Sequence, residues 1–179
     1  MARRKSRGPD LSELPREEQV KKAREIAYRR LGMRDYARAE LGEVLAKRGL
    51  PEGVILQTLA EMEAAGYVDD ARFAQEYVRR RLAVKPMSRR VLGIELRRKG
   101  ISEELISAAL SELAPETELA GAISLAENRL LAASGNPDTL EQRVYAMLAR
   151  RGYTYEQCTK ALRIARENVR AANEDRLTE

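Results

Sequence analysis

One segment of 23 residues occurs three times in this chain and limits its possible folds more than any other feature. The copies superpose without a gap, and a glycine stands at the same place in each, at Gly49, Gly100 and Gly152. A segment repeated at a fixed period indicates a fold built from copies of one small structural unit. The three copies are residues 40–62, 91–113 and 143–165.

Each of these glycines stands where a helix is expected to end. Lys or Arg residues precede it, where cations interact favourably with the negative end of a helix dipole, and glycine readily takes the left-handed conformation that follows a last turn. An apolar residue comes next, then Pro, Ser or Thr, with an acid within two positions, which is typical of a helix start. Each copy therefore predicts two helices joined by a tight turn at glycine.

A further amphipathic stretch lies upstream of each pair and predicts a third helix in every copy. In the middle stretch, Phe73, Ala74, Tyr77 and Val78 recur at helical spacing. With no Trp and one Phe, the core must consist mainly of Leu, Ile, Val, Ala and Met, which suit helix packing. We therefore predict an all-α fold, a tandem array of three three-helix repeats that is elongated and solenoid-like. The upstream stretches are residues 20–31, 71–84 and 119–132.

The predicted boundaries follow from the repeats and from turn residues between them. A basic N-terminal arm precedes the first repeat and a tail follows the third, and we expect both ends of the chain to be disordered outside the repeats. The predicted segments are an arm at 1–19, repeats at 20–68, 69–114 and 115–166, and a tail at 167–179.

The composition argues against catalysis. The chain has no His, and its single Cys excludes an intrachain disulfide and a thiolate zinc site. No phosphate-binding glycine loop or metal motif occurs, so we expect no catalytic residue, no cofactor and no metal. Cys158 aligns with Ile55 and Ile106 and is interpreted as a core residue, while Asp69 and Asp70 are interpreted as helix N-caps.

No apolar run is long enough to span a membrane, and a lone cysteine fits a reducing compartment. We therefore expect a soluble, cytoplasmic protein with no membrane partner, and a monomer. The formal net charge of +5 and a pI near 9.5 suggest a polyanionic partner.

The cations are concentrated in the middle of the chain. Residues 79–100 contain nine Lys or Arg against one carboxylate, Glu95, whereas residues 101–128 contain six carboxylates and no Lys or Arg. A merely solubilising charge would be more evenly mixed. The segregation favours a basic face that contacts phosphates, with largely sequence-independent, salt-sensitive binding. The seven Tyr residues are scattered, so we do not expect the aromatic platform of a dedicated single-strand binding protein.

Aligning the repeats separates two kinds of cation in this region. Arg98 and Lys99 have basic counterparts in the other copies and are interpreted first as helix C-terminal cations. Arg90 and Arg97 have none, and their spacing of seven places them on one helix face, away from the expected core residues Leu92 and Leu96. The candidate DNA-binding residues are Arg79, Arg80, Arg81, Lys85, Arg89, Arg90, Arg97 and Arg98.

Together, these motifs resemble the RecX family of regulators of the bacterial RecA recombinase. The resemblance rests on GYVDDARFAQEYVRRR (66–81), ELRRKGI (95–101) and LAKRGL (45–50), and spans residues 20–166. It implies tandem three-helix repeats that bind a RecA-type recombinase filament and its single-stranded or duplex DNA. It further implies that the chain slows ATP hydrolysis and strand exchange, acting in homologous recombination, DNA repair and the SOS response.

Two other classes of function remain open from the residues alone. Short helices joined at tight turns also occur in helix-turn-helix regulators, for which sequence-specific duplex binding would be decisive. The repeats would equally suit a scaffold that binds only proteins, which would show no affinity for nucleic acid even at low salt.

Overall fold

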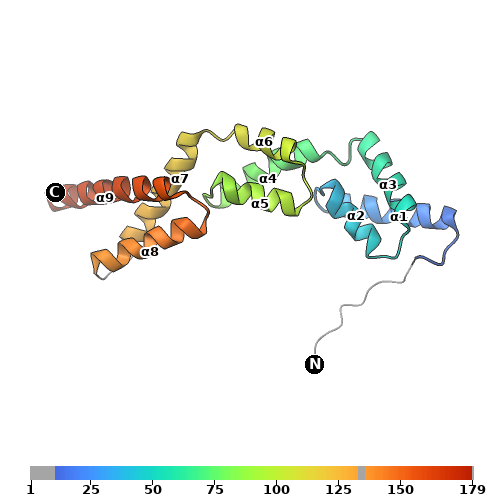
Figure 1. Cartoon of the computed structure of the whole chain (residues 1–179), viewed down its shortest axis with the longest axis horizontal. Helices are drawn as coiled ribbons and strands as arrows, with labels where there is room; N and C mark the ends of the chain where they lie inside the picture. The colour runs from blue at the N-terminus through green and yellow to red at the C-terminus, as the bar shows by residue number, and fades with distance from the viewer. Residues whose placement is uncertain (1–10, 133–135, 179) are drawn as a thin grey trace, which may run out of the picture. The chain divides into compact units, whose positions relative to one another are not determined.

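The computed structural model describes residues 11–132 and 136–178, and these ranges form nine α-helices and no strand. The predicted all-α fold of three-helix repeats is confirmed, since α1–α3, α4–α6 and α7–α9 follow the expected order along the chain (Figure 1). The helices are α1 (Arg16–Leu31), α2 (Arg38–Ala46), α3 (Glu52–Ala64), α4 (Asp70–Val84), α5 (Arg89–Arg98), α6 (Glu103–Ser111), α7 (Pro115–Leu131), α8 (Pro137–Arg150) and α9 (Tyr155–Thr178).

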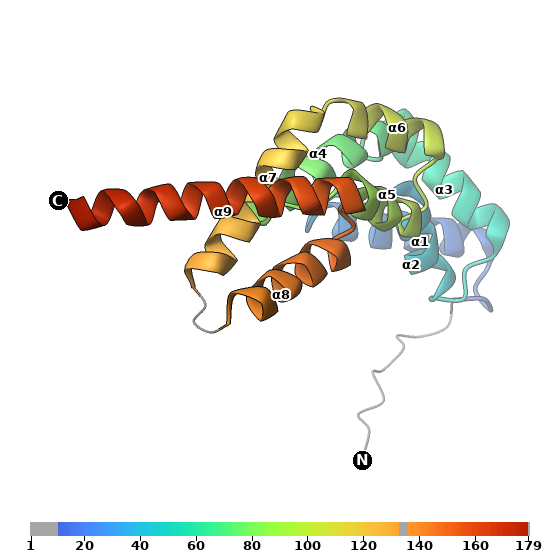
Figure 2. The same cartoon turned by 60° about the vertical axis from the view of Figure 1, so that its left-hand side comes forward.

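The chain divides into two compact units, and the division falls inside the middle repeat. The first unit runs up to Ala74 and includes Leu96–Leu105, and the second contains Gln75–Glu95 and everything from Ile106 onward. In the first unit, α1, α2 and α3 enclose a core that includes the fully buried Leu41 and Leu45. In the second, the long helix α9 crosses α7 and packs on α8 around the buried Val144 and Leu148 (Figure 2).

The three turn glycines have the predicted left-handed conformation, with φ of 79° at Gly49, 81° at Gly100 and 80° at Gly152. After Gly100, the backbone N–H of Ile101 donates to the Leu96 carbonyl at 3.3 Å, the long hydrogen bond of a Schellman helix end. Gly66, with φ of 72°, ends α3 in the same conformation, although only the other three were predicted.

One pair of facing core positions is filled differently in the third repeat. In the second repeat, a Cβ placed on Gly93 would lie 3.6 Å from Ile106, so the glycine makes room for the isoleucine. The equivalent pair in the third repeat is Tyr145 and Cys158, a large residue opposite a small one. Cys158 is fully buried, as predicted, and its thiol donates to the Tyr153 carbonyl at 3.6 Å.

Parts of the predicted arm and of the predicted tail lie within the described residues and form regular contacts or helix. Residues 1–10 of the expected arm lie outside the described residues, but Leu11 is buried and its N–H donates to the Arg48 carbonyl at 2.9 Å. Helix α1 then begins at Arg16 rather than at residue 20. Residues 167–178 of the predicted tail continue α9.

Candidate nucleic-acid interface

The second half of α4 carries the first candidate cations on its exposed surface. Arg79 is three-quarters exposed and lies 3.0 Å from Glu76 one turn earlier. The exposed Arg80 donates from Nε to the Glu76 carbonyl at 3.3 Å. Local pairs of this kind between exposed groups are weak, so both guanidinium groups can exchange these partners for a phosphate.

Arg81 instead joins α4 to α5 through a two-pronged ion pair. Its Nε and Nη2 donate to the two carboxylate oxygens of Glu95 at 2.8 and 2.6 Å, and the Tyr77 hydroxyl lies 3.0 Å from the same carboxylate. The hydrogen bond to Glu95 raises the pKa of Arg81. The guanidinium of Arg81 is therefore engaged in a contact within the second unit, and a ligand would have to compete with Glu95 for it.

Arg89 likewise makes contacts within the fold. Its backbone N–H donates to Glu118 Oε1 at 2.9 Å, and its guanidinium donates to the Leu113 carbonyl and lies 3.6 Å from Glu118 Oε2. Glu118 is buried, with 8% of its side chain exposed. The sequence analysis grouped Arg89 with the surface cations. Its carboxylate partner on α7 is 29 residues away, so no local pattern indicates the contact.

The cations of α5 differ in their surroundings. Leu92 and Leu96 are fully buried, as predicted, and Arg90, Arg97 and Arg98 are exposed. Arg97 binds Glu103 through both its Nε and Nη2, the latter at 2.8 Å, and this hydrogen-bonded pair raises the pKa of Arg97. Within the described ranges, three of the candidates make no ion pair: Lys85, Arg90 and Arg98.

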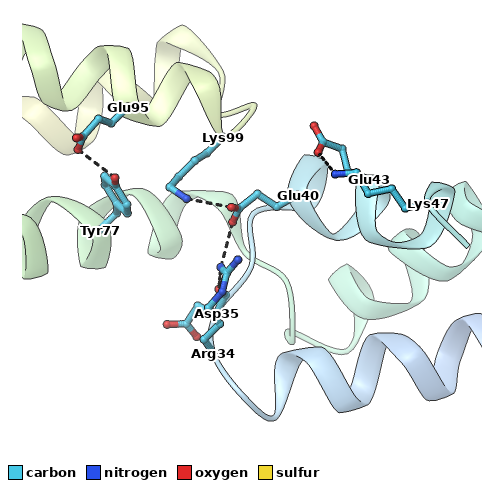
Figure 3. Close-up of polar contacts among 8 residues, drawn as sticks. All are labelled: Arg34, Asp35, Glu40, Glu43, Lys47, Tyr77, Glu95 and Lys99. Carbon is cyan, nitrogen blue, oxygen red and sulfur yellow. Dashed lines mark hydrogen bonds and ion pairs between the residues drawn. The ribbon is translucent and has the colours of Figure 1, made fainter. Parts of the chain in front are cut away.

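Lys99 lies in a polar cluster of the first unit (Figure 3). Its Nζ is 3.0 Å from Glu40 Oε1, and Arg34 binds the other oxygen of Glu40 at 3.2 Å. Burial raises the pKa of Glu40, but the hydrogen bonds from Lys99 and Arg34 outweigh it, so its pKa is lowered overall. Within the first unit, the predicted helix-terminal cation thus also ties the turn after α5 to the start of α2.

The paired aspartates Asp69 and Asp70 are caps, but for two different helices. Asp69 Oδ1 accepts from the backbone N–H of Arg72 at 2.9 Å, which caps its own helix α4, as predicted. Asp70 Oδ1 accepts from the N–H of Arg38 at 2.8 Å, at the first residue of α2. Among the described residues, no three carboxylate or thiol side chains gather as a metal site.

Comparison with known proteins identifies the family. Three sequence models of the RecX family match this chain in succession, its first three-helix domain at residues 23–62, its second at 69–110 and its third at 116–162. The chain belongs to the RecX family. The resemblance inferred from the repeat motifs is thereby confirmed.

Proteins named regulatory protein RecX match over most of their length. The one from Thermobifida fusca is 37% identical over 165 residues, covering 92% of this chain and 88% of the relative. The one from Mycobacterium ulcerans is 42% identical over 148 residues, covering 82% and 84%. These relatives place the chain among RecX regulatory proteins.

Solved RecX structures share the fold. The crystal structure of RecX from Lactobacillus salivarius has a TM-score of 0.73 at 19% identity, covering 83% of this chain and 97% of that one. A second crystal structure of regulatory protein RecX has a TM-score of 0.74 at 23% identity, covering 81% and 73%.

None of the described helices of this RecX-family chain is long and apolar enough to cross a bilayer.

Proposed function

We propose that this chain binds a RecA-type recombinase filament together with its DNA and slows ATP hydrolysis and strand exchange. Membership of the RecX family supports the regulatory role. The DNA contact is supported by three of the candidate cations, which are exposed and make no ion pair in the described part of the chain: Lys85, Arg90 and Arg98.

The proposed interface contains fewer residues than the eight candidates predicted from sequence. Arg81 and Arg89 already bind internal carboxylates, and leaving Glu95 or Glu118 without its cation would cost stability. Arg79 and Arg97 form exposed ion pairs and Arg80 donates to an exposed backbone carbonyl, and a phosphate oxygen can replace contacts of this kind. We therefore assign the primary phosphate contacts to the unpaired cations and the secondary ones to these three.

The mechanism is binding rather than bond breaking. Cations that neutralise phosphates release condensed counterions, so affinity falls as salt rises, with a log-log slope of roughly 0.7 per phosphate on single strands. Contacts of this kind do not distinguish one sequence from another. A chain that holds the DNA and the recombinase together would stabilise one state of the filament and oppose the cycle of ATP hydrolysis.

The decisive experiment titrates the purified chain into a recombinase filament that is hydrolysing ATP on single-stranded DNA. We expect dose-dependent slowing at near-stoichiometric or lower ratios. Hydrolysis that stays constant at saturating protein would refute the proposed function. A footprint on one duplex sequence, without any effect on the recombinase, would favour a helix-turn-helix regulator instead.

The assignment of the cations is tested by a pair of double variants. Arg90→Ala with Arg98→Ala is expected to reduce DNA affinity and lower the salt slope by about 1.4, two phosphates' worth, while the fold is retained. Arg81→Ala with Arg89→Ala should mainly lower the melting temperature. An unchanged salt slope in the first variant would remove those two residues from the interface.

A further inference from the structure

Two tyrosines of the first unit form an exposed aromatic pair that the sequence gave no reason to expect. Tyr28 lies on α1 and Tyr67 in the turn after α3, 39 positions apart, yet their ring centroids are 5.5 Å apart with an interplanar angle of 87°. This edge-to-face arrangement is favourable for aromatic rings and leaves ring surface open to solvent. The exposed fractions are 48% for Tyr28 and 53% for Tyr67.

The exposure of this pair separates it from the tyrosines that build the core. Tyr36 and Tyr153 are 8% and 4% exposed and contribute to the packing of their units. Tyr28 and Tyr67 leave about half of each residue in water, although more complete burial would have been favourable. A pair of adjacent, half-exposed aromatic rings is typical of surfaces that bind a flat or apolar ligand group.

The charge around the pair favours an anionic ligand. Residues 20–34 contain six Lys or Arg and one carboxylate, Glu25, which Lys22 binds at 2.9 Å. Lys21 lies seven residues before Tyr28 and therefore on the same side of α1. At Tyr67, the exposed Arg72 donates to the carbonyl of the preceding residue, Gly66, at 3.0 Å.

Two carboxylates of α3, the helix that precedes Tyr67, are already bound by cations. Arg24 holds Glu61 with two hydrogen bonds of 2.6 and 2.7 Å, and Arg38 binds Glu63 at 2.9 Å. These pairs cancel the negative charge that would otherwise repel a phosphate. Lys21, on the same face of α1 as Tyr28, and Arg72, bound to the carbonyl before Tyr67, are exposed cations outside these ion pairs.

We propose that Tyr28 and Tyr67 form a stacking platform for unpaired bases of single-stranded DNA, with Lys21 and Arg72 contacting the flanking phosphates. The platform uses none of the cations to which the phosphate contacts were assigned above. The inference rests on the proposed function for the identity of its ligand. Stacking requires unpaired bases, so this site distinguishes single strands from duplex, which the phosphate contacts alone do not.

The absence of Trp from the chain allows a direct test. The variant Tyr28→Trp contains a single Trp, and a base stacked on its indole ring quenches the Trp fluorescence. Oligo-dT is expected to quench this emission, whereas an abasic deoxyribose-phosphate oligomer of equal length and charge is not. Leu56→Trp, at an exposed apolar position of the same repeat, is the matched reporter and should respond to neither. Equal responses of the Tyr28 reporter to both oligomers, or no response to either, would overturn the proposal.

Affinity measurements complete the test. Tyr28→Ala with Tyr67→Ala is expected to weaken oligo-dT binding by roughly 5-fold to 30-fold, with little change for duplex. Tyr28→Phe with Tyr67→Phe keeps both rings and should bind as the parent does. If the alanine variant binds oligo-dT normally yet the parent slows recombinase ATP hydrolysis, the platform is refuted and the proposed function stands. If the parent leaves ATP hydrolysis unchanged while the fluorescence test succeeds, only the recombinase role fails.

Discussion

Asp70 and Glu118 cap helices at the two successive junctions between repeats. Each belongs to the first helix of one repeat and caps the second helix of the repeat before it, Asp70 on the N–H of Arg38 and Glu118 on the N–H of Arg89. Both bonds satisfy one of the free N–H groups at a helix N-terminus, where the dipole favours a negative charge. Neighbouring repeats are thus joined by a cap supplied across the junction.

Removing these caps should destabilise the chain unequally. Glu118→Ala is expected to lower the free energy of unfolding by about 2 kcal/mol, because the N–H and the guanidinium of Arg89 both lose a partner. Asp70→Ala should cost about 1 kcal/mol, as an ordinary cap does. Urea denaturation measures both. Glu116→Ala, an exposed carboxylate on the same turn as Glu118, is the control and should stay within about 0.5 kcal/mol; a loss equal to that of Glu118→Ala would contradict the cap.

Alanine substitutions at the turn glycines distinguish the cost of a left-handed backbone from the cost of a steric clash. At Gly66 a Cβ would meet no atom within 4 Å, so Gly66→Ala should cost only the left-handed conformation, about 1 kcal/mol. At Gly100 the same Cβ would clash with Ala39 at the start of α2, and at Gly152 it would clash with Ser88 and Val91. Thermal melting of the three alanine variants should show larger losses at Gly100 and Gly152. Equal losses at all three positions would mean that the junctions adjust freely.

The ion pair between Arg97 and Glu103 is expected to compete with DNA. Both side chains are exposed, so Glu103→Gln should leave the fold intact and free the guanidinium for a phosphate. We expect oligo-dT to bind more tightly and with a steeper salt dependence, measured by fluorescence anisotropy at several salt concentrations. Glu104→Gln changes the net charge equally at an adjacent exposed residue. If both variants gain the same affinity, overall charge accounts for the effect and Arg97 is not a phosphate contact.

Tyr145 and Cys158 should be coupled in stability. Cys158→Ile restores the residue found in the other repeats but adds volume beside Tyr145, and overpacking of this kind typically costs about 1–3 kcal/mol. Adding Tyr145→Gly recreates the pair Gly93 and Ile106 and should recover part of the loss. A double-mutant cycle from urea denaturation measures the coupling. Additive effects would show that the two positions are independent.

Acid should weaken the link between α1 and α3. Hydrogen bonds from Arg24 and Gln57 lower the pKa of Glu61 from 4.5 to about 2. Because the folded pKa is depressed, the stabilisation is complete above pH 4.5 and is lost as the pH falls toward 2. Glu61→Gln should lower stability at pH 7 by at most about 1 kcal/mol, since the pair is exposed, and by less at pH 3. A constant difference between pH 7 and pH 3 would contradict this contribution.

Much of the fold could be predicted because its signals are local. Each helix end is determined by residues within one or two turns of it. These are the glycines at 49, 100 and 152, the cations before them and the capping residues after them. The burial of Leu92, Leu96 and Cys158 followed from helical periodicity and from the alignment of the repeats. The continuation of α9 to Thr178 was missed because residues 167–178 carry few apolar side chains and no repeat counterpart.

The candidate interface was predicted less well, because the availability of a cation depends on partners that are distant in sequence. Arg81 and Arg89 look like Arg90 and Arg98 in a basic segment, but carboxylates 14 and 29 residues away bind the first two. The exposure of Arg90 and Arg97, by contrast, follows from helix geometry alone.

The sequence by itself determined the helices, their turns, the repeat and the concentration of positive charge, since these depend on neighbouring residues and on periodicity. Only the tertiary structure decided which arginines are committed to internal carboxylates and which tyrosines meet, as Tyr28 and Tyr67 do across 39 positions. The reason is physical. Ion pairing and ring contact act over a few ångströms, and only packing brings distant parts of the chain within that range.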